Sequence, residues 1–221
     1  KCSQFPSIGF DLSVADIYLS AVTSNQLIIV KNELDNLFPG DFIKKNKINH
    51  LTCTPTLINL IDNANQLKSS FLKSLKTIFF CGEPLTFINL KKIFHAIPNV
   101  KIYNTYGPTE ATVSMTNLAL NNKNYKKYYK KFISIGKPIK NMNIILFKNN
   151  KIDKEKGEIL ISGPQLASGY YKNKEETKKK FKLFNHKKYY FTGDLGFKYN
   201  KNFYFDKRSD SQVKIKGFRV E

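Results

Sequence analysis

Short apolar stretches alternate with segments of helical spacing through the first 120 residues, and this alternation constrains the fold more than any other feature. Four stretches rich in β-branched and aromatic residues indicate buried strands: 27–30, 50–54, 76–82 and 100–104. Helical spacing of apolar residues occupies 56–67 and 85–96. Strands that alternate with helices are typical of βαβ units, so the sequence predicts a parallel sheet.

The helix predicted at 85–96 is amphipathic. Its spacing places Ile88, Ile93 and Phe94 toward the sheet and Lys91 and Lys92 toward solvent. We therefore expect this helix to cover one face of the parallel sheet.

The predicted pattern of secondary structure changes after about residue 133. Short strand-like stretches with glycine-bearing turns follow one another, among them MNIILF, GEILISG and NFYFDKR. The fold class expected is α/β: a parallel βαβ subdomain at 1–132, then a small antiparallel β-barrel subdomain at 133–206. The basic loop at 121–132 marks the boundary between them.

The formal net charge of +20 does not by itself indicate nucleic-acid binding. Arginine, which reads phosphate and guanine with a fixed fork, occurs only at Arg208 and Arg219 among 37 basic residues. The lysines are therefore interpreted as a solvated surface, and no nucleic-acid partner is expected. No apolar run approaches the length of about 20 residues that spans a membrane, so no membrane insertion is expected.

Three cysteines at distant positions, Cys2, Cys53 and Cys81, do not suit a disulfide framework or a zinc site. They fit a reducing compartment, and the protein is expected in the cytoplasm.

Residues 103–116, YNTYGPTEATVSMT, contain no lysine and follow the predicted strand at 100–104. Ligands of open α/β sheets bind at this end of the strands. Asn104 offers an amide for a base edge, Tyr106 an aromatic face and Thr109 a hydroxyl for phosphate, while Glu110 offers a hard oxygen for Mg²⁺. The alternative is an ordinary turn in which Thr109 caps a helix.

Three further segments carry candidate polar groups. Asp194, in the glycine turn YFTGDLG, suits a ribose diol but is also a common turn residue. Arg208, within 206–221, could hold ribose or phosphate with its fork, or form a surface ion pair. Asp11 could bind an ammonium group, or cap the helix that follows it.

Taken in order, the motifs FDLSVADIY, TPT, FFCGEPL, YNTYGPTEATVSMT, GEILISG, GYY, YFTGDLG and RSDSQVKIKGFRVE resemble the acyl-adenylate-forming superfamily. The resemblance covers nearly the whole chain. Asp11 matches the aspartate that holds the substrate amino group in the amino-acid-activating branch. Within that branch, FDLSV-DIY, FFCGE-L and NTYGPTEATV are most similar to the D-alanine–D-alanyl carrier protein ligase family.

The resemblance implies an enzyme that uses ATP and Mg²⁺ to adenylate a small amino acid, with D-alanine expected, and then transfers it to the phosphopantetheine thiol of a carrier protein. The roles that it implies fall on the residues that follow. Thr109 and Glu110 are catalytic, with Glu110 on the metal; ATP or AMP contacts Asn104, Thr105, Tyr106, Gly107, Thr109, Asp194 and Arg208; the acyl pocket is lined by Asp11, Ala15, Cys81, Thr105, Val113 and Ser114.

The resemblance also assigns the C-terminal segment 207–221 to a hinge and the start of a further domain. Asp210 matches the hinge residue, and Lys214 lies in the segment associated with the thioester-forming step. Cys81 matches a cysteine that narrows the pocket in this family; the alternative is an inert buried thiol.

Other features depart from the family pattern. The phosphate-binding loop and the catalytic lysine of the superfamily have no counterpart here, and Lys207 replaces the usual glycine. We therefore expect a fold that is incomplete at both ends and a fragment that is inactive alone. An adenylation domain of a nonribosomal peptide synthetase, or a nucleotide-binding remnant without catalysis, remain as alternatives.

Overall fold

The computed structural model describes residues 1–210, 213–215 and 218–220. The chain forms two compact units. The first contains residues 1–104 and 119–133, and the second contains residues 105–118 and 134–221. The sequence places 105–118 with the parallel sheet, whereas the structure groups this segment with the second unit. The reason is packing, because Ala111 and Met115 are buried in the hydrophobic core of the second unit.

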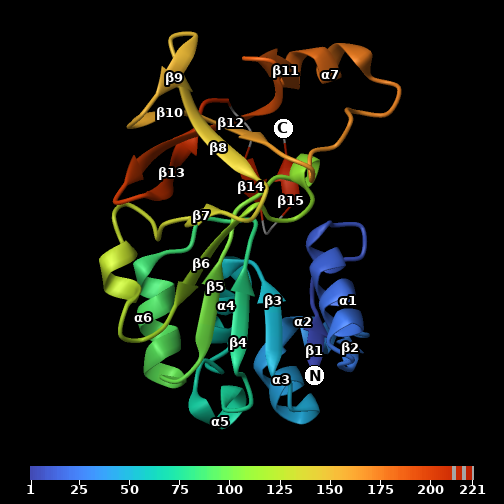
Figure 1. The fold of residues 1–221 in the computed structure, drawn as a ribbon. Coiled ribbons are helices and arrows are strands. Elements are labelled where there is room, and N and C mark those ends of the chain that lie inside the picture. Colours follow the sequence, from blue (N-terminus) through green and yellow to red (C-terminus); the bar gives the residue numbers. More distant parts are fainter. Residues whose placement is uncertain (211–212, 216–217, 221) are drawn as a thin grey trace. The chain divides into compact units, whose positions relative to one another are not determined.

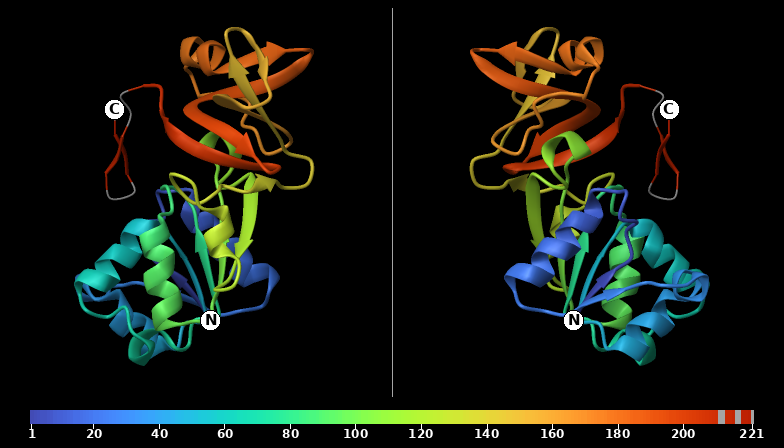
Figure 2. Two further views of the ribbon diagram at one scale, coloured as in Figure 1. Left: turned by 90° about the vertical axis from the view of Figure 1, so that its left-hand side faces the viewer. Right: turned by 90° about the vertical axis from the view of Figure 1, so that its right-hand side faces the viewer.

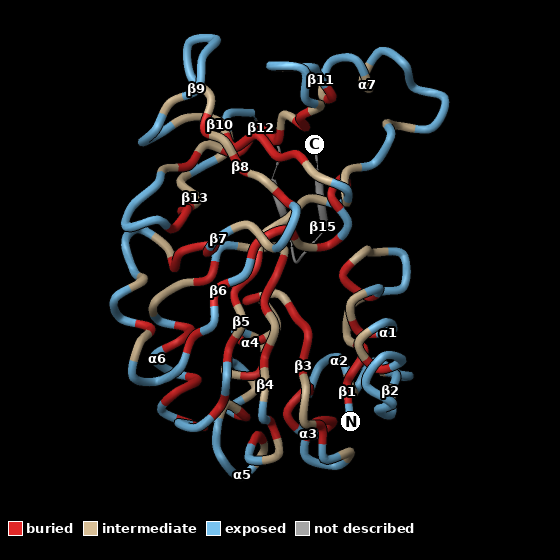
Figure 3. The backbone as a smooth tube through the Cα atoms, in the orientation of Figure 1, coloured by how far each residue is buried: buried red, intermediate tan, exposed pale blue. Residues whose placement is uncertain are grey.

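The first unit is built on a parallel sheet with the strand order β2-β1-β3-β4-β5 (Figure 1). Its strands are β1 (Cys2–Gln4), β2 (Leu27–Ile29), β3 (His50–Cys53), β4 (Thr77–Phe80) and β5 (Lys101–Asn104). Apart from β1, each lies in a stretch that the sequence predicts as a strand. The central strands β3 and β4 are largely buried, whereas the outer surfaces of the helices are exposed (Figure 3).

Helices pack on both faces of this sheet. Helix α1 (Leu12–Val22) covers one face, and α3 (Pro39–Asn46), α4 (Pro55–Asn63) and α6 (Phe87–Ala96) cover the other (Figure 2). Shorter helices are α2 (Glu33–Leu37), α5 (Ser69–Leu72) and the 3-10 turn η2 (Tyr125–Tyr128). Local signals set the helix starts: Pro55 occupies the first turn of α4, and the Thr86 side chain caps α6.

Two details of the first unit differ from the sequence prediction. The strand β2 is only half-buried, and Ile29 is 53% exposed, because β2 lies at the edge of the sheet and pairs on one side. Ile88 is 63% exposed, because the inward face of α6 is set by Leu90, Ile93 and Phe94 at helical spacing.

The second unit is built on an antiparallel sheet with the order β11-β12-β10-β8-β9, and β13 pairs with the other part of the long strand β12. Its strands are β8 (Asn143–Lys148), β9 (Lys151–Asp153), β10 (Lys156–Ser162), β11 (Phe181–Phe184), β12 (Lys187–Tyr199) and β13 (Asn202–Arg208). The fold class is therefore confirmed. Among the described residues the sheet is open rather than a closed barrel.

Smaller elements complete the chain. They are the 3-10 turn η1 (Thr109–Ala111), β6 (Thr116–Leu120), β7 (Lys137–Pro138), α7 (Lys174–Lys180), β14 (Val213–Ile215) and β15 (Phe218–Val220). The start of β6 pairs antiparallel with β7, and β14 with β15. No helix among the described residues is both long and apolar enough to cross a membrane.

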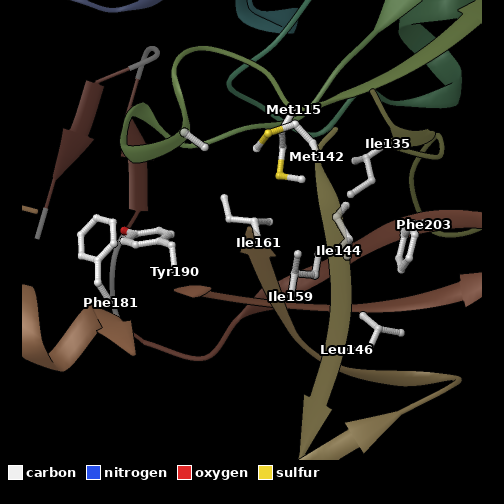
Figure 4. Packing of buried hydrophobic residues seen from close by; sticks show 11 residues of the cluster. Met115, Ile135, Met142, Ile144, Leu146, Ile159, Ile161, Phe181, Tyr190 and Phe203 are labelled. Atoms are coloured by element: carbon white, nitrogen blue, oxygen red, sulfur yellow. The ribbon is translucent and has the colours of Figure 1, made fainter. Parts of the chain in front are cut away.

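The core of the second unit gathers apolar side chains from the sheet and from the segment 105–118 (Figure 4). Ile144, Ile159 and Ile161 from β8 and β10 pack with Met115, and Tyr190 packs beside Phe181. This core fixes the segment 105–118 against the sheet, and that segment carries several of the predicted site residues.

Candidate functional site

Three residues that are distant in the sequence meet in the second unit. The Tyr106 hydroxyl donates a hydrogen bond to Asp194 Oδ2 at 2.6 Å, and Arg208 Nη1 donates to Asp194 Oδ1 at 2.8 Å. The side chains of Arg208 and Asp194 are 22% and 12% exposed, so this is a partly buried ion pair rather than a surface one. Tyr106, Asp194 and Arg208, three of the residues that the resemblance assigns to the nucleotide, therefore form one hydrogen-bonded network, whereas Glu110 bonds to Tyr170 instead.

Strand pairing explains why Asp194 and Arg208 meet. They lie on β12 and β13 and face each other directly in the antiparallel register. The Thr192 hydroxyl accepts a hydrogen bond from the Asp194 backbone N–H at 2.9 Å, and the Thr192 carbonyl accepts from Arg208 Nη1 at 2.8 Å. The carboxylate and the guanidinium are thus fixed by the sheet and by each other.

Arg208 also reaches toward the C-terminal segment. Its Nε and Nη2 donate to the two carboxylate oxygens of Asp210 at 2.8 and 2.5 Å. Burial alone would lower the pKa of the Arg208 guanidinium, but hydrogen bonds to Asp210 and the charge of Asp194 raise it above its ordinary value. Burial and the negative charge of Asp194 raise the pKa of the Tyr106 phenol well above its usual value. The phenol is therefore a stable hydrogen-bond donor at neutral pH.

Glu110 lies in η1 and is buried. Its Oε1 accepts a hydrogen bond from the Tyr170 hydroxyl at 2.5 Å, and the Tyr190 hydroxyl lies 3.3 Å from that of Tyr170. The described residues contain no group of three or more His, Cys, Asp or Glu side chains arranged for a metal. A single carboxylate beside a phosphate-bearing ligand is nonetheless the donor set that Mg²⁺ commonly uses, so Glu110 fits this ion.

The turn that follows β5 has an unusual backbone. Thr112 and Val113 adopt left-handed conformations with φ of 55° and 65°. Gly107 is required by close approach, since a Cβ there would lie 2.7 Å from Ser114 Cα. Thr109 is exposed and begins η1, and the cap position belongs to Pro108, so the structure does not favour a capping role for Thr109.

The remaining predicted pocket residues are divided between the units. Asp11, Ala15 and Cys81 belong to the first unit, and Thr105, Val113 and Ser114 to the second. Asn104, which is predicted to contact the nucleotide, also lies in the first unit. The complete acyl pocket therefore stays a prediction.

Within the first unit, Cys81 and Asn104 share one edge of the sheet. Cys81 directly follows β4, and Asn104 ends β5 in register with Phe80. Both side chains are buried, at 3% and 2% exposure. Asp11 precedes α1 and does not cap it with its side chain, although α1 packs on β1 and β3 of the same sheet.

Lys214 lies in β14, and nothing is described of its side chain. Its predicted role in the thioester-forming step therefore stays a prediction.

Sequence reasoning missed several residues that support the site. Tyr170 and Tyr190 appear in the quoted motifs GYY and YFTGDLG, but nothing in the local pattern connects them with Glu110. Thr192 was likewise not identified, because its contacts with Asp194 and Arg208 depend on the pairing of β12 with β13.

Comparison with known proteins gives one family and many relatives. Residues 2–171 match the AMP-binding enzyme family. D-alanine–D-alanyl carrier protein ligases of Bacillus cytotoxicus and of Bacillus cereus strain G9842 are each 34% identical over 220 residues, which is 96% of this chain. The chain spans 43% of the length of these curated relatives.

Solved structures agree with the fold. The Vibrio cholerae adenylation domain AlmE, in complex with glycyl-adenosine-5′-phosphate, is 30% identical and superposes with a TM-score of 0.90, covering 99% of this chain and 42% of that one. PA1221, which contains adenylation and PCP domains, is 24% identical with a TM-score of 0.85 over 100% of this chain and 45% of its own, a likeness of fold alone.

Proposed function

Because this chain belongs to the AMP-binding enzyme family, we propose that it is the nucleotide-binding part of an ATP-dependent ligase that adenylates a small amino acid. The carrying observation is the contact of Tyr106, Asp194 and Arg208, drawn from distant segments into one network. D-alanine is the substrate that the relatives' names favour, and glycine, bound as its adenylate in AlmE, is also small.

The first step would be attack of the substrate carboxylate oxygen on the α-phosphorus of ATP. A bond from that oxygen to phosphorus forms, the bond to the bridging oxygen breaks, and pyrophosphate leaves. This chemistry needs positioning and charge stabilisation more than a side-chain nucleophile. Mg²⁺, when bound with ATP, would neutralise phosphate charge beside Glu110.

The residues of the network would hold the nucleoside. Asp194 accepts hydrogen bonds from Tyr106 and Arg208, and each of its oxygens has a further lone pair for a ribose hydroxyl. Thr109, at the exposed start of η1, suits a phosphate oxygen. Asn104 would contact the edge of adenine, and the ring of Tyr106 its face.

The second step would transfer the aminoacyl group to a phosphopantetheine thiol on a carrier protein, with AMP as the leaving group. The relatives' names include a carrier protein, which supports this partner. Asp210, bound here by Arg208, would be the hinge between the two steps, and Lys214 would act in the second. We expect the protein in the cytoplasm, where ATP is abundant and its three free cysteines stay reduced.

Amino-acid-dependent exchange of pyrophosphate into ATP tests this function. The full-length protein is assayed with D-alanine, L-alanine, glycine and a panel of larger amino acids. Exchange that is greatest with D-alanine supports the proposal in full. Preference for a large side chain contradicts the substrate and favours a synthetase adenylation domain, whereas exchange with none of them contradicts adenylation itself.

The selectivity of the pocket is tested at Cys81, which is 3% exposed at the end of β4. Replacing Cys81 with alanine opens space, so we expect the ratio of kcat/KM for D-alanine over L-alanine to fall about tenfold. An unchanged ratio would show that Cys81 is an inert buried thiol.

A further inference from the structure

The loop formed by residues 163–170, between β10 and α7, lies against the turn formed by residues 109–114. The Ala167 backbone N–H donates to the Glu110 carbonyl at 2.8 Å. The Thr112 hydroxyl donates to the Gln165 carbonyl at 3.1 Å. Both segments belong to the second unit, so this contact lies within one compact body.

The Gln165 side chain spans the strained part of the turn. Its Nε2 donates to the carbonyls of Thr112 and Ser114, each at 3.4 Å, and these residues flank Val113. Left-handed backbone is costly for a β-branched residue and persists only where the surroundings impose it. The Gln165 amide supplies such a constraint from outside the turn.

The loop is itself held in place. Lys188 Nζ donates to the Ser168 carbonyl at 2.7 Å, and the Tyr170 backbone N–H donates to Thr177 Oγ1 at 2.9 Å. A Cβ on Gly169 would lie 2.4 Å from Thr177 Cγ2, so only glycine permits this close approach. The loop therefore presents Gln165 and Tyr170 from a fixed position.

Tyr170 completes the contact at Glu110. Because the Tyr170 hydroxyl donates its proton to Glu110 Oε1, it can only accept from Tyr190, whose hydroxyl lies 3.3 Å away. A tyrosine phenol is protonated at neutral pH, so the Tyr190 hydroxyl can be the donor in this pair. The direction of both hydrogen bonds is thus toward the carboxylate.

We infer that Tyr170 and Gln165 are positioning residues that fix the Glu110 carboxylate and the 109–114 turn for a magnesium-bound nucleotide. The inference rests on the proposed function, because Glu110 is the expected magnesium ligand there. Neither residue needs to touch the substrate. Tyr170 orients one carboxylate oxygen, and Gln165 holds the backbone that carries Val113 and Ser114.

Tyr170→Phe removes only the hydroxyl and keeps the ring packed against Phe181, whose centroid is 5.7 Å away. We expect the Mg²⁺ concentration for half-maximal pyrophosphate exchange to rise about tenfold, with the KM for the amino acid changed less than twofold. Calorimetric titration with ATP should show the same loss in Mg²⁺-dependent affinity. Tyr171→Phe is the matched control, since Tyr171 is 88% exposed.

Gln165→Met tests the backbone constraint without any metal. Hydrogen exchange in the metal-free protein should become at least fivefold faster in a peptide covering 109–114 and stay unchanged in β8. Wild-type rates in that peptide, or equal Mg²⁺ dependence of Tyr170→Phe and Tyr171→Phe in a protein that exchanges pyrophosphate, would overturn the inference alone. A wild-type protein without amino-acid-dependent exchange would instead overturn the proposed function and the inference with it.

Discussion

The two units differ in how they hydrogen-bond a buried carboxylate. In the first unit, Asp16 on α1 is 0% exposed, and within the described part of the chain neither of its oxygens has a hydrogen-bond partner of normal geometry. In the second unit, Asp194 is 9% exposed and accepts hydrogen bonds from Tyr106 and Arg208. Both acids are largely buried, but only Asp194 accepts strong hydrogen bonds from described side chains.

This difference in hydrogen bonding decides whether pH or local geometry governs the state of each acid. Burial raises the pKa of Asp16 to about 7, and only the neighbouring Thr52 hydroxyl acts against the shift. Asp16 is therefore sensitive to pH. Asp194 is sensitive to geometry, because its orientation depends on a fork that Arg208 shares with Asp210.

The largest expected effect follows from weakening the hydrogen bonds that Arg208 donates to Asp194. Arg208→Lys keeps the charge but loses the fork, so the hydrogen bonds to Asp194 and Asp210 cannot both form. We expect kcat/KM for ATP in pyrophosphate exchange to fall about 50-fold, equivalent to about 2.3 kcal/mol, with a much smaller change in the KM for the amino acid.

Lys207→Ala is the control for that measurement, because Lys207 is the exposed neighbour on the same strand. It should leave kcat/KM for ATP within twofold of the wild type. Equal effects of the two substitutions would mean that charge alone, and not the fork, serves the site.

The second-largest expected effect is the pH dependence of stability that Asp16 causes. Asp16 is protonated in the folded state up to about pH 7, whereas in the unfolded chain it ionises near pH 4. Its contribution to the free energy of unfolding therefore falls as pH rises from 4 to 7. Asp16→Asn removes this loss, so the stability advantage of the variant should grow by on the order of 4 kcal/mol across that range, measured by urea unfolding.

His50 on β3 acts in the opposite sense in the same window. Burial lowers the pKa of His50 to about 4, so stability is lost as pH falls from 6.5 toward 4. The two dependences partly cancel in the wild type. Asp16→Asn should expose the His50 dependence, and the exposed acid Glu33→Gln should not. The nearby thiols of Cys2 and Cys53 do not compete in this range, because burial raises the pKa of each.

The smallest expected effect concerns Glu83, an acid of the first unit that, unlike Asp16, accepts well-formed hydrogen bonds. Its Oε2 accepts from the Thr56 backbone N–H at 3.0 Å and from the Thr56 hydroxyl at 2.6 Å. Thr56→Val should lower the free energy of unfolding by about 1.5 kcal/mol. Thr56→Ser keeps the hydroxyl, so it should retain most of the wild-type stability. Equal losses in thermal or urea unfolding would contradict a role for the hydroxyl.

Much of the first unit could be predicted from local sequence. The strands β3, β4 and β5 and the helix α6 lie in the predicted stretches, and α4 begins one residue before its own, because apolar spacing is a property of neighbouring residues. The sequence does not predict β1. It predicts that Ile88 and β2 are buried, and both predictions are wrong. Burial depends on which element is at an edge, and local spacing does not contain that information.

The sequence proposes residue types for the candidate site, and the structure adds the contacts between them. The motifs around Tyr106, Asp194 and Arg208 pointed to one ligand, and the structure brings these three side chains together. The roles of Tyr170 and Gln165 were not foreseen. Their contacts join segments about 50 to 60 positions apart, as the separations of 51 and 60 residues indicate.

By itself, the sequence determined the alternation of strands and helices, the short strands with glycine-bearing turns that follow it and the family to which the chain belongs. These depend on the chemistry of neighbouring residues and on motif order. Only the tertiary structure decided that Asp16 is buried without a well-formed hydrogen bond from any described residue, while Asp194 is held by Arg208. Solvent exclusion and hydrogen-bond geometry arise when distant segments pack together, and no single segment encodes them.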